Sequence, residues 1–91
     1  MLKFTTTNRF EKDYTKMEKR GKDIDKLNAI MQKLINEDPL EPKYRNHALK
    51  GNFKDRRECH REPDWLLIYK INAQENMIIF ERTGSHADIF E

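Results

Sequence analysis

The chain has 91 residues, of which 36% are hydrophobic and 37% are charged, and its net charge is +2. This length is enough for one small domain over residues 1–91 and excludes a second domain. The single cysteine excludes an internal disulfide, and no apolar run is as long as a membrane span, so we expect a cytoplasmic protein without membrane contact.

The first half of the sequence predicts a strand followed by two helices. Residues 1–5 place two apolar side chains on one face and lead into threonines, which is typical of a short strand. Asn8 is expected to cap a helix that ends near residue 20. Asp23 is expected to cap a second helix, in which apolar residues recur at helical spacing as far as residue 35. The short connection between them predicts an antiparallel hairpin.

The second half predicts three strands, over residues 55–60, 65–72 and 77–83. The turns between them are short, so the strands should form an antiparallel meander. Residues 65–72 are apolar at consecutive positions, and we expect both faces of this strand to be covered. On the preceding strand, Cys59 and His60 are neighbours and should therefore point to opposite faces.

A basic block lies between the helices and the last two strands. Residues 43–61 contain seven Lys or Arg and two Asp or Glu, whereas residues 62–91 contain two and six. Such a block attracts an anion such as a nucleic-acid backbone, although a solvated basic face would explain the charge equally well. The candidate RNA-binding residues in the block are Lys50, Lys54, Arg56, Arg57 and Arg61.

Metal and cofactor chemistry has no motif in this sequence. Cys59 and His60 cannot easily share a metal from opposite faces, and no C-x-x-C or H-x-x-x-H spacing occurs, so we expect no metal site. Cys59 is expected to be a small core residue. Glycine-rich nucleotide-binding motifs do not occur, so we expect no cofactor.

Three histidines in the second half suggest acid–base chemistry. His47, His60 and His86 lie at expected strand ends or loops, where any one of them alone is commonly a polar surface residue. Together, one imidazole can take a proton from a ribose 2′-hydroxyl while another gives a proton to the leaving 5′-oxygen. Arg82 can offset the charge that builds on the phosphate. RNA cleavage of this kind needs neither a metal nor a protein nucleophile.

Three sequence blocks resemble a known protein family. They are His-Ala-Leu-Lys-Gly at residues 47–51, Arg-Glu-Cys-His-Arg-Glu-Pro-Asp-Trp-Leu-Leu-Ile-Tyr at 57–69, and Arg-Thr-Gly-Ser-His-Ala-Asp-Ile-Phe at 82–90. In this order and spacing they resemble the YafQ branch of the RelE/ParE superfamily, the toxins of bacterial type II toxin-antitoxin modules. The resemblance implies an α+β fold of two N-terminal helices packed on a twisted, mainly antiparallel four-stranded sheet. It also implies a toxin that cleaves mRNA in the ribosomal decoding site.

The resemblance assigns an acid–base group to four positions of this chain. His86 would be the general acid toward the leaving oxygen. His60 or His47 would be the general base, and the resemblance does not choose between them. Asp64 would orient or tune a histidine.

The resemblance also assigns binding roles around this group. Arg82 would stabilise the phosphorane-like transition state, and Phe90 would position a base or the ribose by packing. Trp65 is expected to be a core residue beneath the site. The basic block would bind phosphates of ribosomal RNA or mRNA.

The partners implied by the resemblance are mRNA, the ribosome and a small acidic antitoxin with a disordered tail. One alternative is a non-catalytic nucleic-acid-binding module, in which the basic block alone accounts for the activity and the histidines are incidental. Another is a ParE-type inhibitor of DNA gyrase. That branch lacks the histidine set, so the presence of the set favours the ribonuclease.

Overall fold

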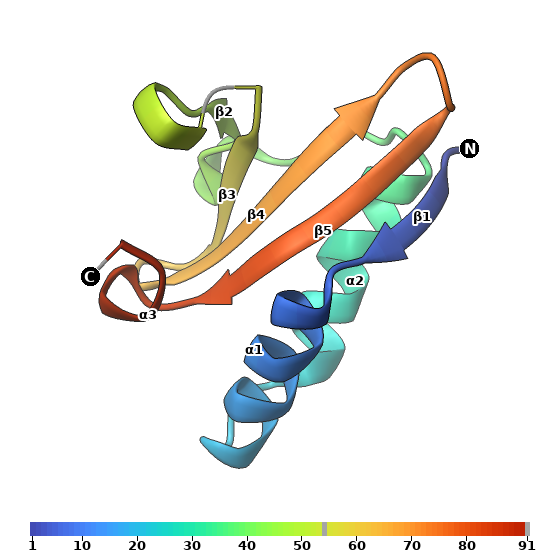
Figure 1. The fold of residues 1–91 in the computed structure, drawn as a ribbon. Coiled ribbons are helices and arrows are strands. Elements are labelled where there is room, and N and C mark those ends of the chain that lie inside the picture. Colours follow the sequence, from blue (N-terminus) through green and yellow to red (C-terminus); the bar gives the residue numbers. More distant parts are fainter. Residues whose placement is uncertain (54, 91) are drawn as a thin grey trace.

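The computed structural model describes residues 1–53 and 55–90 and shows a mixed five-stranded sheet with a helical hairpin on one face (Figure 1). The strands lie in the order β1-β5-β4-β3-β2, and the pairing of β1 with β5 is parallel. No helix in these described ranges is long and apolar enough to cross a membrane. The elements in chain order are β1 (Lys3–Thr6), α1 (Asn8–Lys19), α2 (Ile24–Ile35), η1 (Pro42–Tyr44), β2 (His47–Ala48), η2 (Gly51–Phe53), β3 (Arg57–Glu62), β4 (Trp65–Asn72), β5 (Met77–Gly84) and α3 (His86–Phe90).

The α+β class and the helical hairpin are confirmed, whereas the sheet has five strands rather than the predicted four. The additional strand, β2, is only two residues long, which is too short to show an alternating pattern in the sequence. β1 is an edge strand parallel to β5, and the chain between them passes through α1, α2 and the strands β2, β3 and β4, which is long enough for a parallel pairing.

Several predicted element boundaries differ from the structure by one or two residues, and two of the differences have clear local reasons. Thr7 rather than Asn8 caps α1, since its Oγ1 accepts a hydrogen bond from the N–H of Phe10 at 3.0 Å. β3 begins at Arg57 rather than at residue 55, because Asp55 has a φ of 69° and this left-handed conformation cannot belong to a strand.

Strand β4 is covered on both faces, as its apolar sequence predicted. On the face toward α1 and α2, Trp65 and Tyr69 belong to the larger hydrophobic core. On the opposite face, Leu66 and Ile68 form a smaller core with Ile89 of α3. The smaller core therefore attaches the end of the chain to the face that the helical hairpin leaves uncovered.

Neighbouring residues of β3 point to opposite faces, which confirms the predicted alternation. Cys59 belongs to the larger core, whereas His60 pairs with Leu66 and shares the face of the smaller core. Burial raises the pKa of the Cys59 thiol to about 12. The thiolate is therefore scarce at neutral pH, which agrees with a structural role for this cysteine.

The short helix α3 is anchored by the carboxylate of Asp88. Asp88 accepts a hydrogen bond from the N–H of Ser85 at 2.9 Å and donates its own N–H to Ser85 Oγ at 3.1 Å, so the two residues form a capping box. Near the end of α1, Arg20 and Lys16 contact the same carboxylate at 2.7 and 3.1 Å. Gly84 precedes the helix with a φ of 152°, and a Cβ there would lie only 3.0 Å from that of Asp88.

We expect the anchoring of α3 to weaken at acidic pH. The side-chain hydrogen bond from Arg20, followed by the Ser85 N–H, holds the pKa of the Asp88 carboxyl well below its usual range. A carboxyl with a depressed folded-state pKa contributes stability above its unfolded pKa of about 4, and this contribution is lost as the pH falls through the folded pKa. The free energy of unfolding should therefore fall below about pH 4.

Urea unfolding between pH 2 and pH 7 measures this effect. Asp88→Asn should be less stable than the wild type at neutral pH, and the difference should shrink as the solution becomes acidic. A difference that is constant across the range would contradict the assignment.

Candidate active site

The predicted catalytic residues lie on the sheet face opposite α1 and α2. Residues that pair across strands share a face. The register pairs Glu58 with both His47 of β2 and Ile68 of β4, and it pairs Ile68 with Arg82 of β5. These four residues form one row across the sheet. His60 lies on the same face, one alternate position further along β3.

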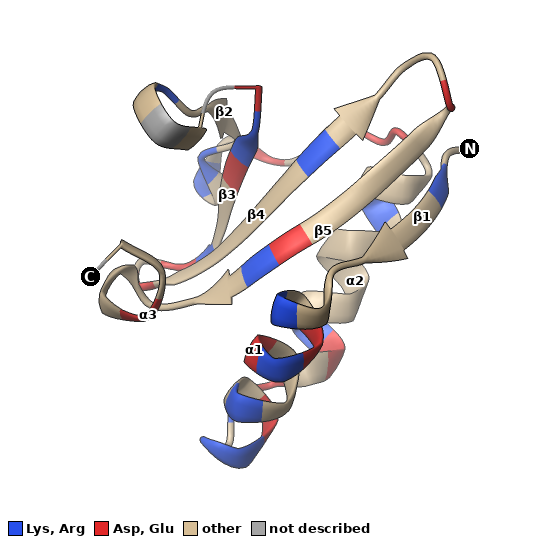
Figure 2. Ribbon diagram, viewed as in Figure 1, with Lys and Arg blue, Asp and Glu red and all other residues tan. Residues whose placement is uncertain are grey.

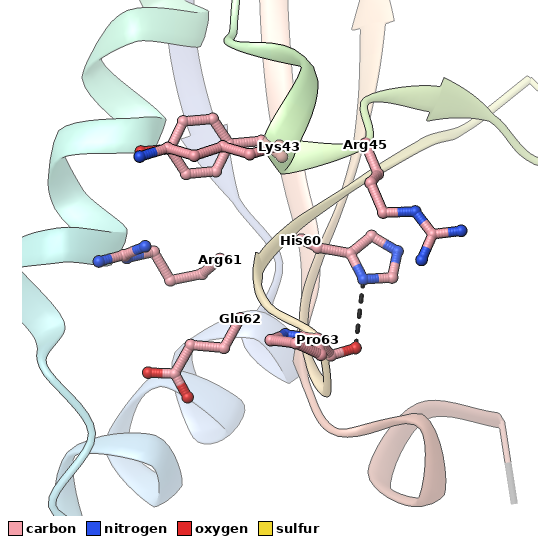
Figure 3. A pocket seen from close by; sticks show the side chains of 7 residues that line it. Lys43, Arg45, His60, Arg61, Glu62 and Pro63 are labelled. Carbon is pink, nitrogen blue, oxygen red and sulfur yellow. Dashed lines mark hydrogen bonds between the residues drawn. The ribbon is translucent and has the colours of Figure 1, made fainter.

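His60 is 7% exposed and lines a pocket of about 180 Å³ (Figure 3). Its Nδ1 donates a hydrogen bond to the Pro63 carbonyl at 3.3 Å. Arg45 lines the same pocket, whereas the Arg61 side chain extends toward α2 and away from His60. Arg45 was not singled out in the sequence, although it lies in the basic block.

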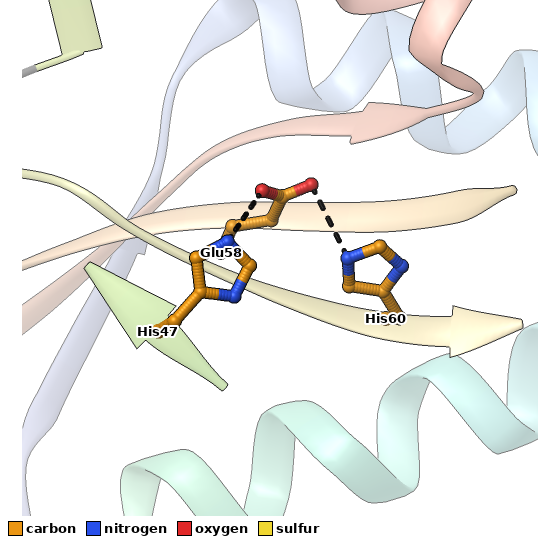
Figure 4. Close-up of side chains that lie close together, drawn as sticks. All are labelled: His47, Glu58 and His60. Atoms are coloured by element: carbon orange, nitrogen blue, oxygen red, sulfur yellow. Dashed lines mark ion pairs between the residues drawn. The ribbon is translucent and has the colours of Figure 1, made fainter. Parts of the chain in front are cut away.

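A buried carboxylate holds two of the histidines together (Figure 4). Glu58, 5% exposed, places Oε2 3.2 Å from His47 Nε2 and Oε1 3.5 Å from His60 Nε2. The remaining nitrogen of His47, Nδ1, donates to the Arg45 carbonyl at 2.6 Å. A proton gained by either ring is therefore balanced by the charge of the same carboxylate.

His86 is the first residue of α3 and is held by Asp64. The Asp64 carboxylate accepts from the backbone N–H of His86 at 2.9 Å and from its Nδ1 at 2.8 Å. These two hydrogen bonds, the backbone one first, lower the pKa of Asp64. Because Nδ1 donates to the carboxylate, Nε2 is the nitrogen available to a substrate.

The rings at the site form a continuous series. Ring centroids are separated by 6.1 Å for His47 and His60, 6.0 Å for His60 and His86, and 6.1 Å for His86 and Phe90. Phe90 then meets Phe53 edge to face at 5.0 Å. The series brings together all the predicted histidines and Phe90, and it extends to an aromatic residue that the sequence analysis did not assign.

Arg82 is oriented by a buried aspartate of α1. Its Nε donates to Asp13 Oδ2 at 2.7 Å, and its Nη2 donates to the Asp88 carbonyl at 3.1 Å. The same Asp13 oxygen accepts the backbone N–H of Thr83 at 3.2 Å. This part of β5 lies beyond its pairing with β1, which stops at Phe80, so Asp13 takes the place of a neighbouring strand.

Glu58 and Asp13 were not predicted from the sequence, although each lies in a recognisable pattern. Glu58 lies two residues before His60 on one strand, which puts their side chains on the same face. Asp13 lies three residues after Phe10 and four before Met17, so it is on the buried stripe of its helix. A carboxylate on a buried stripe requires a cationic or hydrogen-bonding partner.

Basic residues are spread over both helices and over β3 (Figure 2), and the described members of the predicted RNA-binding set do not share one face. Arg57 lies on the face of Tyr69, opposite that of His60, and donates from Nε to Asn46 at 3.3 Å. Arg61 lines a depression against α2. Arg56 pairs with Glu81, and Lys50 is exposed. Lys54 lies outside the described residues.

The residues His47, Glu58 and His60 also suit a metal ion. Each offers one ligand atom, and these atoms lie within 4.8 Å of one another. Two imidazoles and a carboxylate are donors that Zn²⁺ and Cu²⁺ accept. The expectation of no metal site stays a prediction. It was based on ligand spacings within one segment, whereas His47, Glu58 and His60 come together through the pairing of β2 with β3.

Comparisons with known proteins identify the family of this chain. Residues 2–91 match the family model described as bacterial toxin of type II toxin-antitoxin system, YafQ. The mRNA interferase toxin YafQ of Escherichia coli K12 is 44% identical over 85 residues, which are 92% of this chain and 90% of that protein.

Solved structures have the same fold over nearly the whole chain. A metal-bound toxin from Helicobacter pylori has a TM-score of 0.93 and 46% identity, covering 99% of this chain and 100% of that chain. The toxin in the E. coli DinJ–YafQ complex has a TM-score of 0.90 and 40% identity, with 100% of both chains covered. The chain therefore belongs to the YafQ family of bacterial toxins of type II toxin-antitoxin systems.

Proposed function

We propose that this toxin is an endoribonuclease that cleaves mRNA by acid–base chemistry of its own side chains, without a metal ion. The observation that supports this is the pair of imidazole rings of His60 and His86, whose centroids are 6.0 Å apart and which each have a nitrogen within 3.5 Å of a different carboxylate. Two such groups can act on opposite sides of one phosphodiester. The E. coli relative named an mRNA interferase toxin supports the same substrate.

In the proposed reaction, His60 takes the proton from the ribose 2′-hydroxyl. The 2′-oxygen bonds to phosphorus, the bond from phosphorus to the 5′-oxygen breaks, and His86 gives a proton to that leaving oxygen. The products are a 2′,3′-cyclic phosphate and a 5′-hydroxyl. Glu58 stabilises the imidazolium that forms on His60, and Asp64 orients His86. We choose His60 over His47 because its ring lies next to that of His86.

Arg82 and Phe90 complete the proposed site. A guanidinium fixed by Asp13 can donate hydrogen bonds to phosphate oxygens without first losing rotational freedom. Phe90 is 41% exposed and lies beside His86, so its ring can pack against a base or ribose. Lys50 and Arg45 would contact the RNA backbone.

We propose mRNA presented by the ribosome as the substrate, and an acidic antitoxin protein as the partner that neutralises the toxin. These partners place the activity in the cytoplasm. The E. coli DinJ–YafQ complex supports an antitoxin partner, because the toxin in it has the same fold as this chain.

Primer extension on a reporter mRNA tests the proposal. The purified protein is added to a reconstituted translation system and, separately, to the same mRNA without ribosomes. We expect defined cuts that require ribosomes and that carry 5′-hydroxyl ends. If the folded protein makes no cuts, the proposed ribonuclease activity is wrong and a binding module is favoured. DNA damage in cells that express the protein would favour gyrase inhibition.

A second candidate function is metal binding at His47, Glu58 and His60. It is favoured by the convergence of their ligand atoms and by the similar H. pylori toxin, which is metal-bound. A metal ion there would occupy the lone pair that His60 needs as a base. Metal binding should therefore inhibit cleavage rather than support it.

We expect added Cu²⁺ or Zn²⁺ to inhibit cleavage, and excess chelator to restore it. Isothermal titration should show that Glu58→Gln weakens metal affinity by about tenfold or more, because it removes a charged ligand. His86→Ala is the matched control and should bind the metal like the wild type. Equal affinities in all three proteins would exclude this site.

A further inference from the structure

A second depression lies beside the proposed active site and shares Arg82 with the residues that take part in the proposed reaction. Its volume is about 400 Å³, and it is a largely open surface depression rather than an enclosed pocket. It forms between the start of α1, Phe53 and Arg56 in the region of η2, and β5. The depression is lined by Thr7, Arg9, Phe53, Arg56, Glu81 and Arg82.

The depression is continuous with the active site through two residues. Arg82 lines it and belongs to the same cross-strand row as Glu58. Phe53 lines it and is also the last ring of the series that runs from the histidines, in contact with Phe90. RNA bound between His60 and His86 would therefore reach this depression by passing Phe90.

We propose that this depression binds the nucleotide on the 3′ side of the cleaved bond. The proposal rests on the proposed ribonuclease activity, in which His86 protonates the leaving 5′-oxygen. That oxygen belongs to the 3′ nucleotide, so this nucleotide lies on the His86 side of the cut. The ring centroids of His86 and Phe90 are 6.1 Å apart, and those of Phe90 and Phe53 are 5.0 Å apart. This series of rings runs from the expected position of the leaving oxygen into the depression.

The lining has the chemistry of a single-stranded RNA site. Such sites combine cations along the backbone with an aromatic ring on which a base can stack. Arg9 is exposed in the first turn of α1 and can reach a phosphate, while the Phe53 ring offers a stacking surface. The paired side chains of Arg56 and Glu81 present donors and acceptors to the edge of a base.

The walls of the depression are fixed before RNA binds. The Thr7 hydroxyl donates to the Glu81 carbonyl at 2.9 Å and accepts from the Phe10 N–H, which ties the start of α1 to β5. Arg82 is held by Asp13. A preformed site of this kind favours one nucleotide conformation and can select among bases.

Cleavage mapping on a reporter mRNA library, randomised at the nucleotide that follows each cut, tests the proposal. We expect Arg9→Ala to slow ribosome-dependent cleavage by roughly threefold to tenfold, the loss of a charged contact at an exposed site. Phe53→Leu, which retains an apolar side chain for the smaller core, should change the preferred nucleotide 3′ of the cut. Lys33→Ala on α2 is the control and should change neither. Thermal unfolding verifies that all variants fold.

The outcomes separate this proposal from the function on which it rests. If the wild type cuts and both Arg9→Ala and Phe53→Leu cut at its rate with its 3′ preference, the nucleotide site is wrong and the ribonuclease stands. A change of preference at the 5′ nucleotide instead would overturn the proposed polarity. If the wild type does not cut, the ribonuclease and the nucleotide site both fail.

Discussion

His86→Ala should reduce cleavage by about 10²- to 10⁴-fold, the usual contribution of a general acid, while the protein remains folded. The leaving 5′-oxygen would then depart without a proton, which raises the barrier of that step. The His86 side chain is 55% exposed, and its hydrogen-bond partner Asp64 is 69% exposed. Because neither belongs to a hydrophobic core, the substitution should cost little stability.

Single-turnover cleavage and circular dichroism measure the two parts of this result. Asp64→Asn is the matched variant, since it removes the charge that orients His86 but retains the ring. It should have a smaller effect on the rate and should shift the pH–rate profile on the side set by the general acid. If His86→Ala cleaves at the wild-type rate, another group is the general acid and the assignment of that role to His86 is wrong.

The sequence was informative wherever one residue pattern decided one element. Apolar runs located β4 and β5, and helical spacing located α1 and α2. The three histidines were singled out because they occur together in the second half of the chain with Arg82, although any one of them alone is commonly a surface residue. Glu58 was overlooked because a carboxylate in a basic block is usually solvated, and its burial depends on β2, which is too short to predict.

The division of the basic block illustrates why local charge does not define a surface. A strand alternates its side chains between two faces. Arg57 therefore points to the face of the larger core, opposite His60, although the two are close in sequence. Arg61, two residues after Cys59, lies on the same side by this alternation and lines a depression against α2. The net charge of a segment predicts an attraction to anions, but not which of its residues share a surface.

Asp13→Ala should lower both stability and activity, because it leaves the guanidinium of Arg82 without its partner. The side chains of Arg82 and Asp13 are only 17% and 9% exposed. Removing one member of a buried pair typically costs about 3–5 kcal/mol, and partial exposure of Arg82 should place this variant near the lower value. The N–H of Thr83 also loses its acceptor. Urea unfolding and single-turnover cleavage measure the two effects.

The double variant Asp13→Ala/Arg82→Ala separates these effects. Removing Arg82 as well eliminates the uncompensated cation, so the double variant should recover part of the stability that Asp13→Ala loses. Cleavage should remain as low as in Arg82→Ala, because no guanidinium is left to stabilise the phosphorane. If instead Asp13→Ala unfolds within about 0.5 kcal/mol of the wild type, or if the double variant regains cleavage, Asp13 does not position Arg82 for the reaction.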